Sequence, residues 1–92
     1  MPIYLGQTIR LKHIFYDFEG NVAYPSNHSI TVTDPHGNVI YSSTSPSQQG
    51  DYYLVSFTIP ATAKPGNYKA KWEASSGDYN WIATKTFAVQ TP

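Results

Sequence analysis

The sequence contains no cysteine, which excludes disulfide bonds, thiolate zinc sites, iron–sulfur clusters and cysteine nucleophiles. Charge is also scarce, because only 13% of the residues are charged and six Lys and Arg balance six Asp and Glu. Proteins that bind nucleic acid usually cluster Lys and Arg against the phosphates, whereas the formal net charge of this chain is zero. We therefore expect no nucleic-acid partner.

Long apolar stretches are missing as well. No apolar run comes near the ~20 residues that a membrane-spanning helix needs, so we expect no insertion into a membrane. The first residues, Met1–Gly6, have neither the basic stretch nor the long apolar stretch of a secretory signal peptide. A length of 92 residues predicts a single domain, residues 1–92, with a packed core and little room for a deep catalytic cleft.

Apolar residues are abundant, because 40% of the chain is hydrophobic and 15% is aromatic. A period of two, typical of half-buried strands, runs through five segments of the chain. These segments are 9–16, 29–33, 52–59, 67–74 and 81–89, with Lys85 interrupting the apolar series of the last one. No stretch has the i, i+3, i+4, i+7 spacing of an amphipathic helix, so the sequence predicts an all-β protein.

Turn signals separate the predicted strands. Asp17–Val22 and Asp34–Val39 share the pattern Asp-x-x-Gly-Asn-Val, in which Asp accepts backbone hydrogen bonds and Gly supplies a positive φ. Further connections are expected at Ser42–Gly50, Pro60–Gly66 and Ser75–Asp78. About seven short strands with turn signals every 8–12 residues predict an antiparallel β-sandwich, and an antiparallel barrel is the alternative.

Five motifs of turn and strand residues follow one another along the chain. They are Gly6-Gln7-Thr8-Ile9-Arg10-Leu11, Asp17-Phe18-Glu19-Gly20-Asn21, Thr33-Asp34-Pro35-His36-Gly37-Asn38-Val39, Phe57-Thr58-Ile59-Pro60 and Pro65-Gly66-Asn67-Tyr68-Lys69-Ala70-Lys71-Trp72. In this order they resemble bacterial and phage immunoglobulin-like (Ig-like) domains, and also domains of bacterial macroglobulin-like proteins. The resemblance runs from about Ile3 to Val89 and implies an Ig-like fold rather than an activity.

Tyr68 lies two residues before Ala70, where antibody domains carry a tyrosine corner before their second cysteine. Alanine stands in place of that cysteine, so the resemblance implies the bacterial type of sandwich. Tyr68 and Trp72 share a strand face with Ala70 and Ala74, and this alternation of large and small residues predicts that both rings fill the core between the sheets.

The titratable residues lack the spacing of metal sites. His13 shares the parity of its apolar neighbours, which predicts a structural role, and His28 and His36 lie in expected loops or strand ends. Asp17 and Asp34 are expected to cap their turns, because calcium takes six to eight oxygens and each turn offers one or two carboxylates. A weak surface calcium site is the alternative, and no metal or cofactor is predicted.

Catalytic constellations are not recognisable either. The sequence has no Gly-x-Ser-x-Gly elbow, no glycine-rich phosphate loop and no pair of carboxylates suited to rigid elements around a cleft. It therefore predicts no catalytic residues and no enzymatic activity.

Aromatic residues are the richest feature, with eight Tyr, four Phe and two Trp. Tyr52 and Tyr53 are adjacent and must point to opposite faces of a strand, and we expect Tyr52 to face solvent or a partner. Tyr79 and Trp81 follow the turn at 75–78, where an exposed aromatic tip is expected. Because Tyr and Trp are enriched at interfaces and on sugar-binding platforms, Tyr52, Tyr79 and Trp81 are the candidate interface residues.

Together these features predict a non-enzymatic structural or binding module whose partner is a protein. The resemblance includes small phage proteins, and the missing leader and disulfides favour a virion accessory protein, such as a capsid decoration protein, assembled in the host cytoplasm. It would dock on a repeating protein lattice through exposed Tyr and Trp. Two alternatives stay open: one module of a multi-domain macroglobulin-like or adhesin-like protein at the bacterial cell surface, and a carbohydrate-binding module that uses Tyr79 and Trp81.

Overall fold

A computed structural model of the protein describes residues 2–92, which contain ten β-strands and no helix. The strands are β1 (Ile3–Tyr4), β2 (Thr8–His13), β3 (Phe15–Tyr16), β4 (Val22–Ala23), β5 (Asn27–Thr33), β6 (Val39–Ser43), β7 (Ser47–Gln49), β8 (Tyr52–Thr58), β9 (Gly66–Ser76) and β10 (Tyr79–Gln90). Within this range the chain forms no helix that is long and apolar enough to cross a membrane. The all-β prediction is confirmed.

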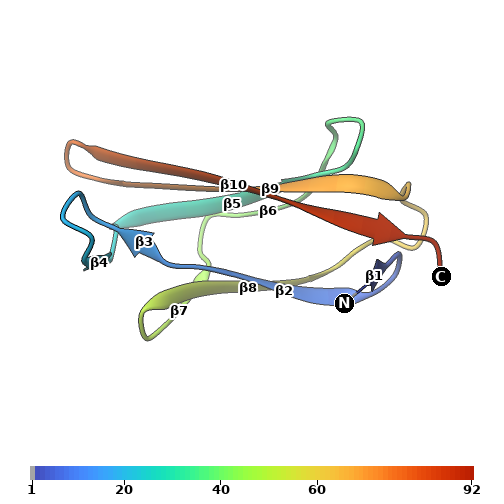
Figure 1. The fold of residues 1–92 in the computed structure, drawn as a ribbon, viewed down its shortest axis with the longest axis horizontal. Helices are drawn as coiled ribbons and strands as arrows, with labels where there is room; N and C mark the ends of the chain where they lie inside the picture. Colours follow the sequence, from blue (N-terminus) through green and yellow to red (C-terminus); the bar gives the residue numbers. More distant parts are fainter. Residues whose placement is uncertain (1) are drawn as a thin grey trace.

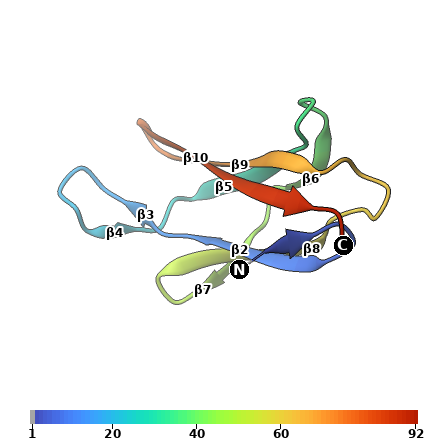
Figure 2. The same ribbon diagram turned by 45° about the vertical axis from the view of Figure 1, so that its right-hand side comes forward.

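Two sheets make the layers of a sandwich (Figure 1). One sheet has five strands in the order β1-β10-β9-β5-β6, and the other has three in the order β2-β8-β7. Strands β3 and β4 pair with each other in a separate hairpin at the end of the sandwich where β9 turns into β10 (Figures 1 and 2). Greek-key-like crossovers between two such layers are typical of Ig-like domains, and this confirms the predicted fold class.

The strand count and one pairing differ from the prediction. The structure has ten strands among residues 2–92 instead of about seven, because segments of two or three residues also pair. β7 lies inside the expected loop Ser42–Gly50, since its exposed Ser and Gln side chains leave no apolar pattern to reveal it. Ile14 interrupts the predicted strand 9–16, and β1 pairs with β10 in parallel, so the sandwich is not wholly antiparallel.

Side chains of alternate strand residues from both sheets fill the space between them. Tyr68 and Trp72 are 0% and 1% exposed, which confirms that both rings belong to the core. The Tyr68 hydroxyl donates a hydrogen bond of 2.6 Å to the backbone carbonyl of Lys64, four residues upstream, as a tyrosine corner does. The sheets are therefore held by packing and by this internal anchor, without a disulfide.

The two Asp-x-x-Gly-Asn turns share the same backbone hydrogen bonds to their first Asp. In each, Oδ1 of the first Asp accepts the backbone N–H groups two and four residues further on, at 2.8–2.9 Å. Gly20 and Gly37 have φ angles of 88° and 85°, which residues with a side chain rarely adopt. Asp17 and Asp34 thus cap their turns as predicted.

Candidate functional site

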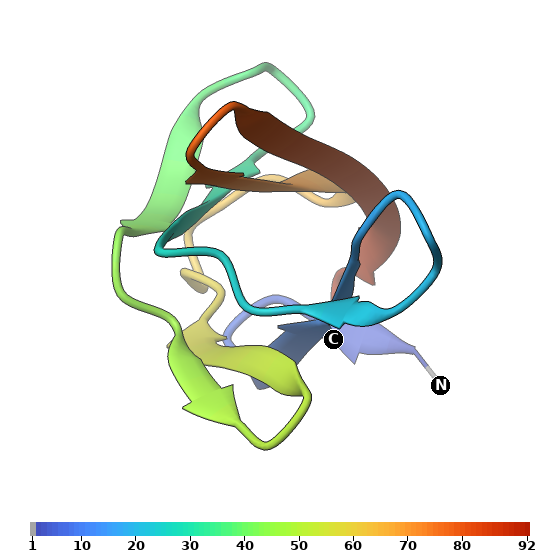
Figure 3. The same cartoon turned by 90° about the vertical axis from the view of Figure 1, so that its left-hand side faces the viewer.

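Figure 3 looks onto the end of the sandwich that holds hairpin β3–β4 and the β9–β10 turn, and Trp81 lies near this end as the third residue of β10. Its Nε1–H donates a hydrogen bond of 2.7 Å to the carbonyl oxygen of Tyr16, and its ring meets Phe15 edge-on at a centroid distance of 6.2 Å. Trp81 is half-buried, and of the two rings expected at an exposed tip it is Tyr79 that is mostly exposed. The β9–β10 ladder continues up to a two-residue turn, so Trp81 stays on the core-facing side, paired with Ala74.

Tyr79 is the exposed member of the predicted aromatic pair. It is 58% exposed, and its ring stacks on that of Trp81 at 5.9 Å between centroids and 27° between planes. Because Trp81 is itself hydrogen-bonded to Tyr16, it gives the Tyr79 ring a fixed surface to stack on at the rim of the sandwich. A rigid aromatic ring of this kind is what protein interfaces favour.

Tyr79 and Trp81 form one wall of a hollow of about 290 Å³, here called the end hollow. The β3–β4 turn supplies another wall through Asp17, Phe18 and Glu19. Phe18 is 92% exposed at the tip of that turn. The end hollow therefore combines exposed aromatic rings with two carboxylates, a surface suited to a protein segment that presents apolar groups next to Lys or Arg.

Tyr24 closes a third side of the end hollow and links two loops. It is 53% exposed, and its hydroxyl donates a hydrogen bond of 2.6 Å to Oδ1 of Asp51. This hydrogen bond to a carboxylate is the main cause that raises the pKa of Tyr24. The contact fixes the ring at the surface between β4 and the β7–β8 turn.

Sequence reasoning missed Phe18, Tyr16 and Tyr24 as exposed rings. Phe18 lies in an expected turn between two acidic residues and belongs to no predicted strand, and this position could have indicated that its ring is exposed. Tyr16 and Tyr24 are each 53% exposed. Tyr16 has the parity opposite to Phe15, which is 1% exposed, so the alternation in segment 9–16 carried a signal for its exposure, whereas Tyr24 follows the two-residue strand β4 and has no such signal.

Tyr52 lies apart from Tyr79 and Trp81. As predicted, it points away from Tyr53, which is 1% exposed in the core, while Tyr52 is half-buried at the surface. Lys12 holds its Nζ 5.3 Å from the centroid of the Tyr52 ring, within cation–π range. The three candidate interface residues therefore do not form one site.

Tyr52 lines a separate cavity of about 310 Å³, here called the side hollow, with Lys12, His13, Tyr16 and Lys85. His13 is half-buried, and its ring stacks on Trp72 at 5.7 Å between centroids. Burial lowers the pKa of His13, and the positive charge of Lys85 lowers it further. The side hollow is thus a positively charged pocket against the core.

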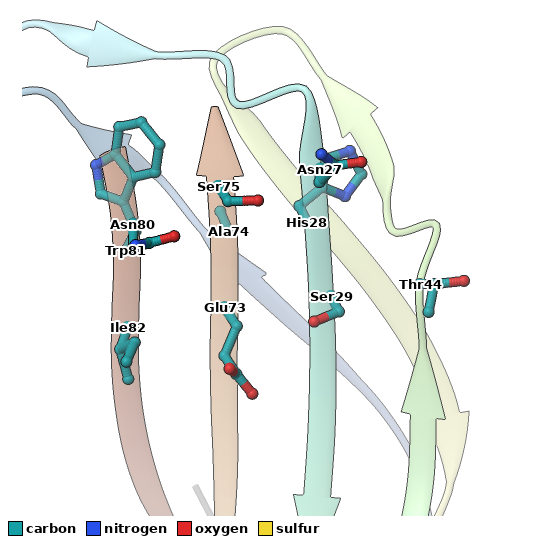
Figure 4. A pocket seen from close by; sticks show the side chains of 10 residues that line it. All are labelled: Asn27, His28, Ser29, Thr44, Glu73, Ala74, Ser75, Asn80, Trp81 and Ile82. Carbon is teal, nitrogen blue, oxygen red and sulfur yellow. The ribbon is translucent and has the colours of Figure 1, made fainter. Parts of the chain in front are cut away.

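A third hollow, of about 510 Å³, lies along β5, β9 and β10. Figure 4 shows Ser29, Glu73 and Ile82 side by side on these three strands. Glu73 is 3.8 Å from Lys71 Nζ, and both side chains are exposed. Most of the remaining lining is polar and uncharged, which makes this a shallow contact surface without paired catalytic groups.

Metal coordination finds no support in the arrangement of the side chains. Among residues 2–92, no three His, Cys, Asp or Glu side chains come together in a group that could hold a metal ion. The carboxylates of Asp17 and Asp34 instead accept backbone N–H groups of their own turns.

The two layers of strands and the tyrosine corner define the class as an Ig-like β-sandwich module. Residues 2–89 match the model of the MG2 domain, a macroglobulin-like Ig-like domain, and the chain belongs to this family. A search of curated proteins gave no match. The family supports the alternative that the sequence left open, an Ig-like module of the macroglobulin-like kind, and gives no support to the main prediction of a virion accessory protein.

Proposed function

We propose that this chain acts as an Ig-like module of a macroglobulin-like protein, and that it contacts a neighbouring module through the end hollow. The match of residues 2–89 to the MG2 domain carries the first part of the proposal. The family is a non-catalytic one, which supports a spacing or binding role without enzymatic activity.

The placement of the exposed rings supports the second part. The sandwich measures 42 × 24 × 20 Å along its principal axes, and hairpin β3–β4 stands at one end of the long axis (Figure 1). Phe18 and Tyr79 are both more than half exposed at that end. Modules in a row touch through their ends, so rings gathered there are positioned for the next module.

Macroglobulin-like domains occur in extracellular and cell-surface proteins, and we propose the same location for this module. The virion accessory role predicted from the sequence gains no support from the family match. Carbohydrate binding through Tyr79 and Trp81 stays a prediction, and it would depend mostly on Tyr79, because the Trp81 ring is packed and its N–H is already bonded to Tyr16.

An immunoblot of the source cells with an antibody against this chain tests the proposal. We expect the antibody to detect a cell-surface polypeptide much larger than the 10.3 kDa of this sequence. Detection of a 10.3 kDa species in purified virus particles would contradict the proposal and revive the accessory role.

A further inference from the structure

Strand β10 has a long side without a strand partner. Its residues Tyr79 to Val89 pair with β9 on one side, whereas on the other side only Val89 and Gln90 pair with β1. Figure 2 shows β1 beside only the last part of β10. Within the described residues, the stretch from Tyr79 to Ala88 is therefore an open sheet edge of the kind that accepts an added strand.

The direction of the free backbone groups follows from the β1 contact. The carbonyl of Gln90 accepts a hydrogen bond of 3.0 Å from the Leu5 N–H, so the backbone groups of Gln90 point away from β9. Alternate residues of a strand direct their N–H and C=O groups to the same side. Ile82, Thr84 and Thr86 therefore present their backbone groups to the open side, and all three side chains are exposed.

Lys85 is the one charged residue on the core-facing parity of β10, in the series Trp81, Ala83, Phe87 and Val89. It reaches the side hollow, where Lys12 and His13 of β2 line the opposite sheet edge. Among residues 2–92, Lys71 and Glu73 form the one ion pair within 4.0 Å. Lys12 and Lys85 in the side hollow therefore have no carboxylate within this distance. The positive charge beside the open edge is thus uncompensated.

We propose that the free edge of β10 takes up an extended acidic segment of a partner polypeptide as an added β-strand, with an Asp or Glu of that segment reaching Lys85 and Lys12 in the side hollow. The edge supplies main-chain hydrogen bonds, and the hollow selects the side chain. Alternate side chains of the added strand point toward the sandwich, so one acidic residue on that side suffices. The centre of this binding site, Ile82 to Thr86 of β10, lies outside the end hollow, and the inference does not rest on the proposed module role.

A second copy of this chain is a poor occupant of the same edge. An antiparallel pairing of two β10 strands around Thr84 places each Lys85 opposite Ala83 of the other copy, so that the two Lys85 side chains become diagonal neighbours on one face. Gathering both positive charges on that face is unfavourable, and inward-pointing charges on an edge strand protect against self-pairing. The charge that repels a second copy is the charge that an acidic segment complements.

The test is an NMR titration of the whole chain with three heptapeptides, Thr-Val-Thr-Glu-Thr-Val-Thr and its versions with Gln or Lys in place of Glu. We expect the Glu peptide to shift the amide signals of Ile82, Thr84 and Thr86 and to slow their hydrogen exchange. The Gln peptide should bind roughly fivefold more weakly, and the Lys peptide more weakly still.

Two variants separate the backbone from the charge. Lys85→Gln should reduce the preference for Glu over Gln, and Lys12 should sustain what remains of it. Lys69→Gln removes the same charge from the outer face of β9 and should leave the preference unchanged. Thr84→Pro removes an N–H that points to the open side and should weaken all three peptides together.

Several results would overturn the proposal. Equal binding of the three peptides would remove the acidic preference, and an equally strong response to sodium acetate would leave an anion site without strand addition. Absence of any shift at millimolar Glu peptide would refute the site itself. Amide protection at Thr84 that grows with protein concentration alone would identify a second copy as the occupant.

Discussion

The turns at Asp17–Asn21 and Asp34–Asn38 share one sequence pattern and the same backbone hydrogen bonds to their first Asp, yet they do different things in the molecule. The second residue of the first turn is Phe18, which is 92% exposed and lines the end hollow. The corresponding residue of the second turn is Pro35, which lies against the backbone of Gly66. The local motif fixes the geometry of a turn, and the neighbouring strand determines whether the turn holds the fold or faces a partner.

The surroundings of the two turns also differ in their anchors. Near the second turn, Tyr68 has a buried ring, and its hydroxyl donates a hydrogen bond to the backbone carbonyl of Lys64. Burial raises the pKa of this hydroxyl, with a further contribution from Asp34. Near the first turn, Tyr24 makes a bond of the same length, 2.6 Å, to Asp51 at the surface. One end of the sandwich is therefore tied to the core, and the other presents its aromatic rings to solvent.

Gly66→Ala should be the most destabilising change. Gly66 has a φ of +138°, and an added Cβ would lie 2.8 Å from Pro35 Cγ, so both the backbone and the proline ring would have to move. We expect a loss of about 2–4 kcal/mol in the free energy of unfolding, measured by urea denaturation. Gly20→Ala, whose Cβ would meet open space, should cost about 1–2 kcal/mol from its positive φ alone. Equal losses of unfolding free energy in Gly66→Ala and Gly20→Ala would contradict the claim that only the second turn is packed against a neighbouring strand.

Tyr68→Phe should have the next largest effect. The change removes the 2.6 Å hydrogen bond to the carbonyl of Lys64 and leaves that partly buried carbonyl without a donor. We expect a loss of about 1–2 kcal/mol in the free energy of unfolding. Tyr24→Phe removes a hydrogen bond of the same length at the exposed end and should leave the thermal midpoint nearly unchanged. A larger effect at Tyr24 would show that the exposed end carries the stability.

Acidification should weaken the second turn through Asp34. Hydrogen bonds from the backbone of Asn38 and His36 hold the pKa of Asp34 below its ordinary value of 3.8 in the folded state. The stability that they give is present above that value and is lost as the pH falls through the folded-state pKa. The difference in unfolding free energy between pH 6 and pH 2 should therefore be smaller in Asp34→Asn than in the natural protein. Equal differences would argue against this role.

Phe18→Ser should have the smallest effect on stability. The ring is exposed and no core contact depends on it, so the free energy of unfolding should change by less than about 0.5 kcal/mol. In the longer protein that we propose, the same change should increase hydrogen exchange at the contact with the neighbouring module. A stable variant with unaltered exchange there would remove Phe18 from the interface.

Local patterns predicted what depends on neighbours in the sequence. The period of two located the main strands, the Asp and Gly pairs located two turns, and the parity of Tyr68 and Trp72 placed both rings in the core. These features follow from strand geometry and turn chemistry, which a single segment already contains.

Features that join distant segments could not be predicted in this way. The bond from Trp81 to Tyr16 spans 65 residues, and the side hollow collects Lys12 and Lys85 from different sheets. β7 pairs through its backbone while all its side chains are exposed, so hydropathy carries no trace of it. Such contacts depend on how the two layers are stacked, which no local pattern specifies.

A double-mutant cycle tests the difference between the turns most directly. Gly66→Ala should be less destabilising by at least about 1 kcal/mol when Pro35 is also replaced by Ala, because the ring that blocks the new Cβ is then gone. For Gly20→Ala combined with Phe18→Ala, the two effects should add within about 0.5 kcal/mol. Additive effects at Gly66 and Pro35, or strong coupling at Gly20 and Phe18, would contradict the account.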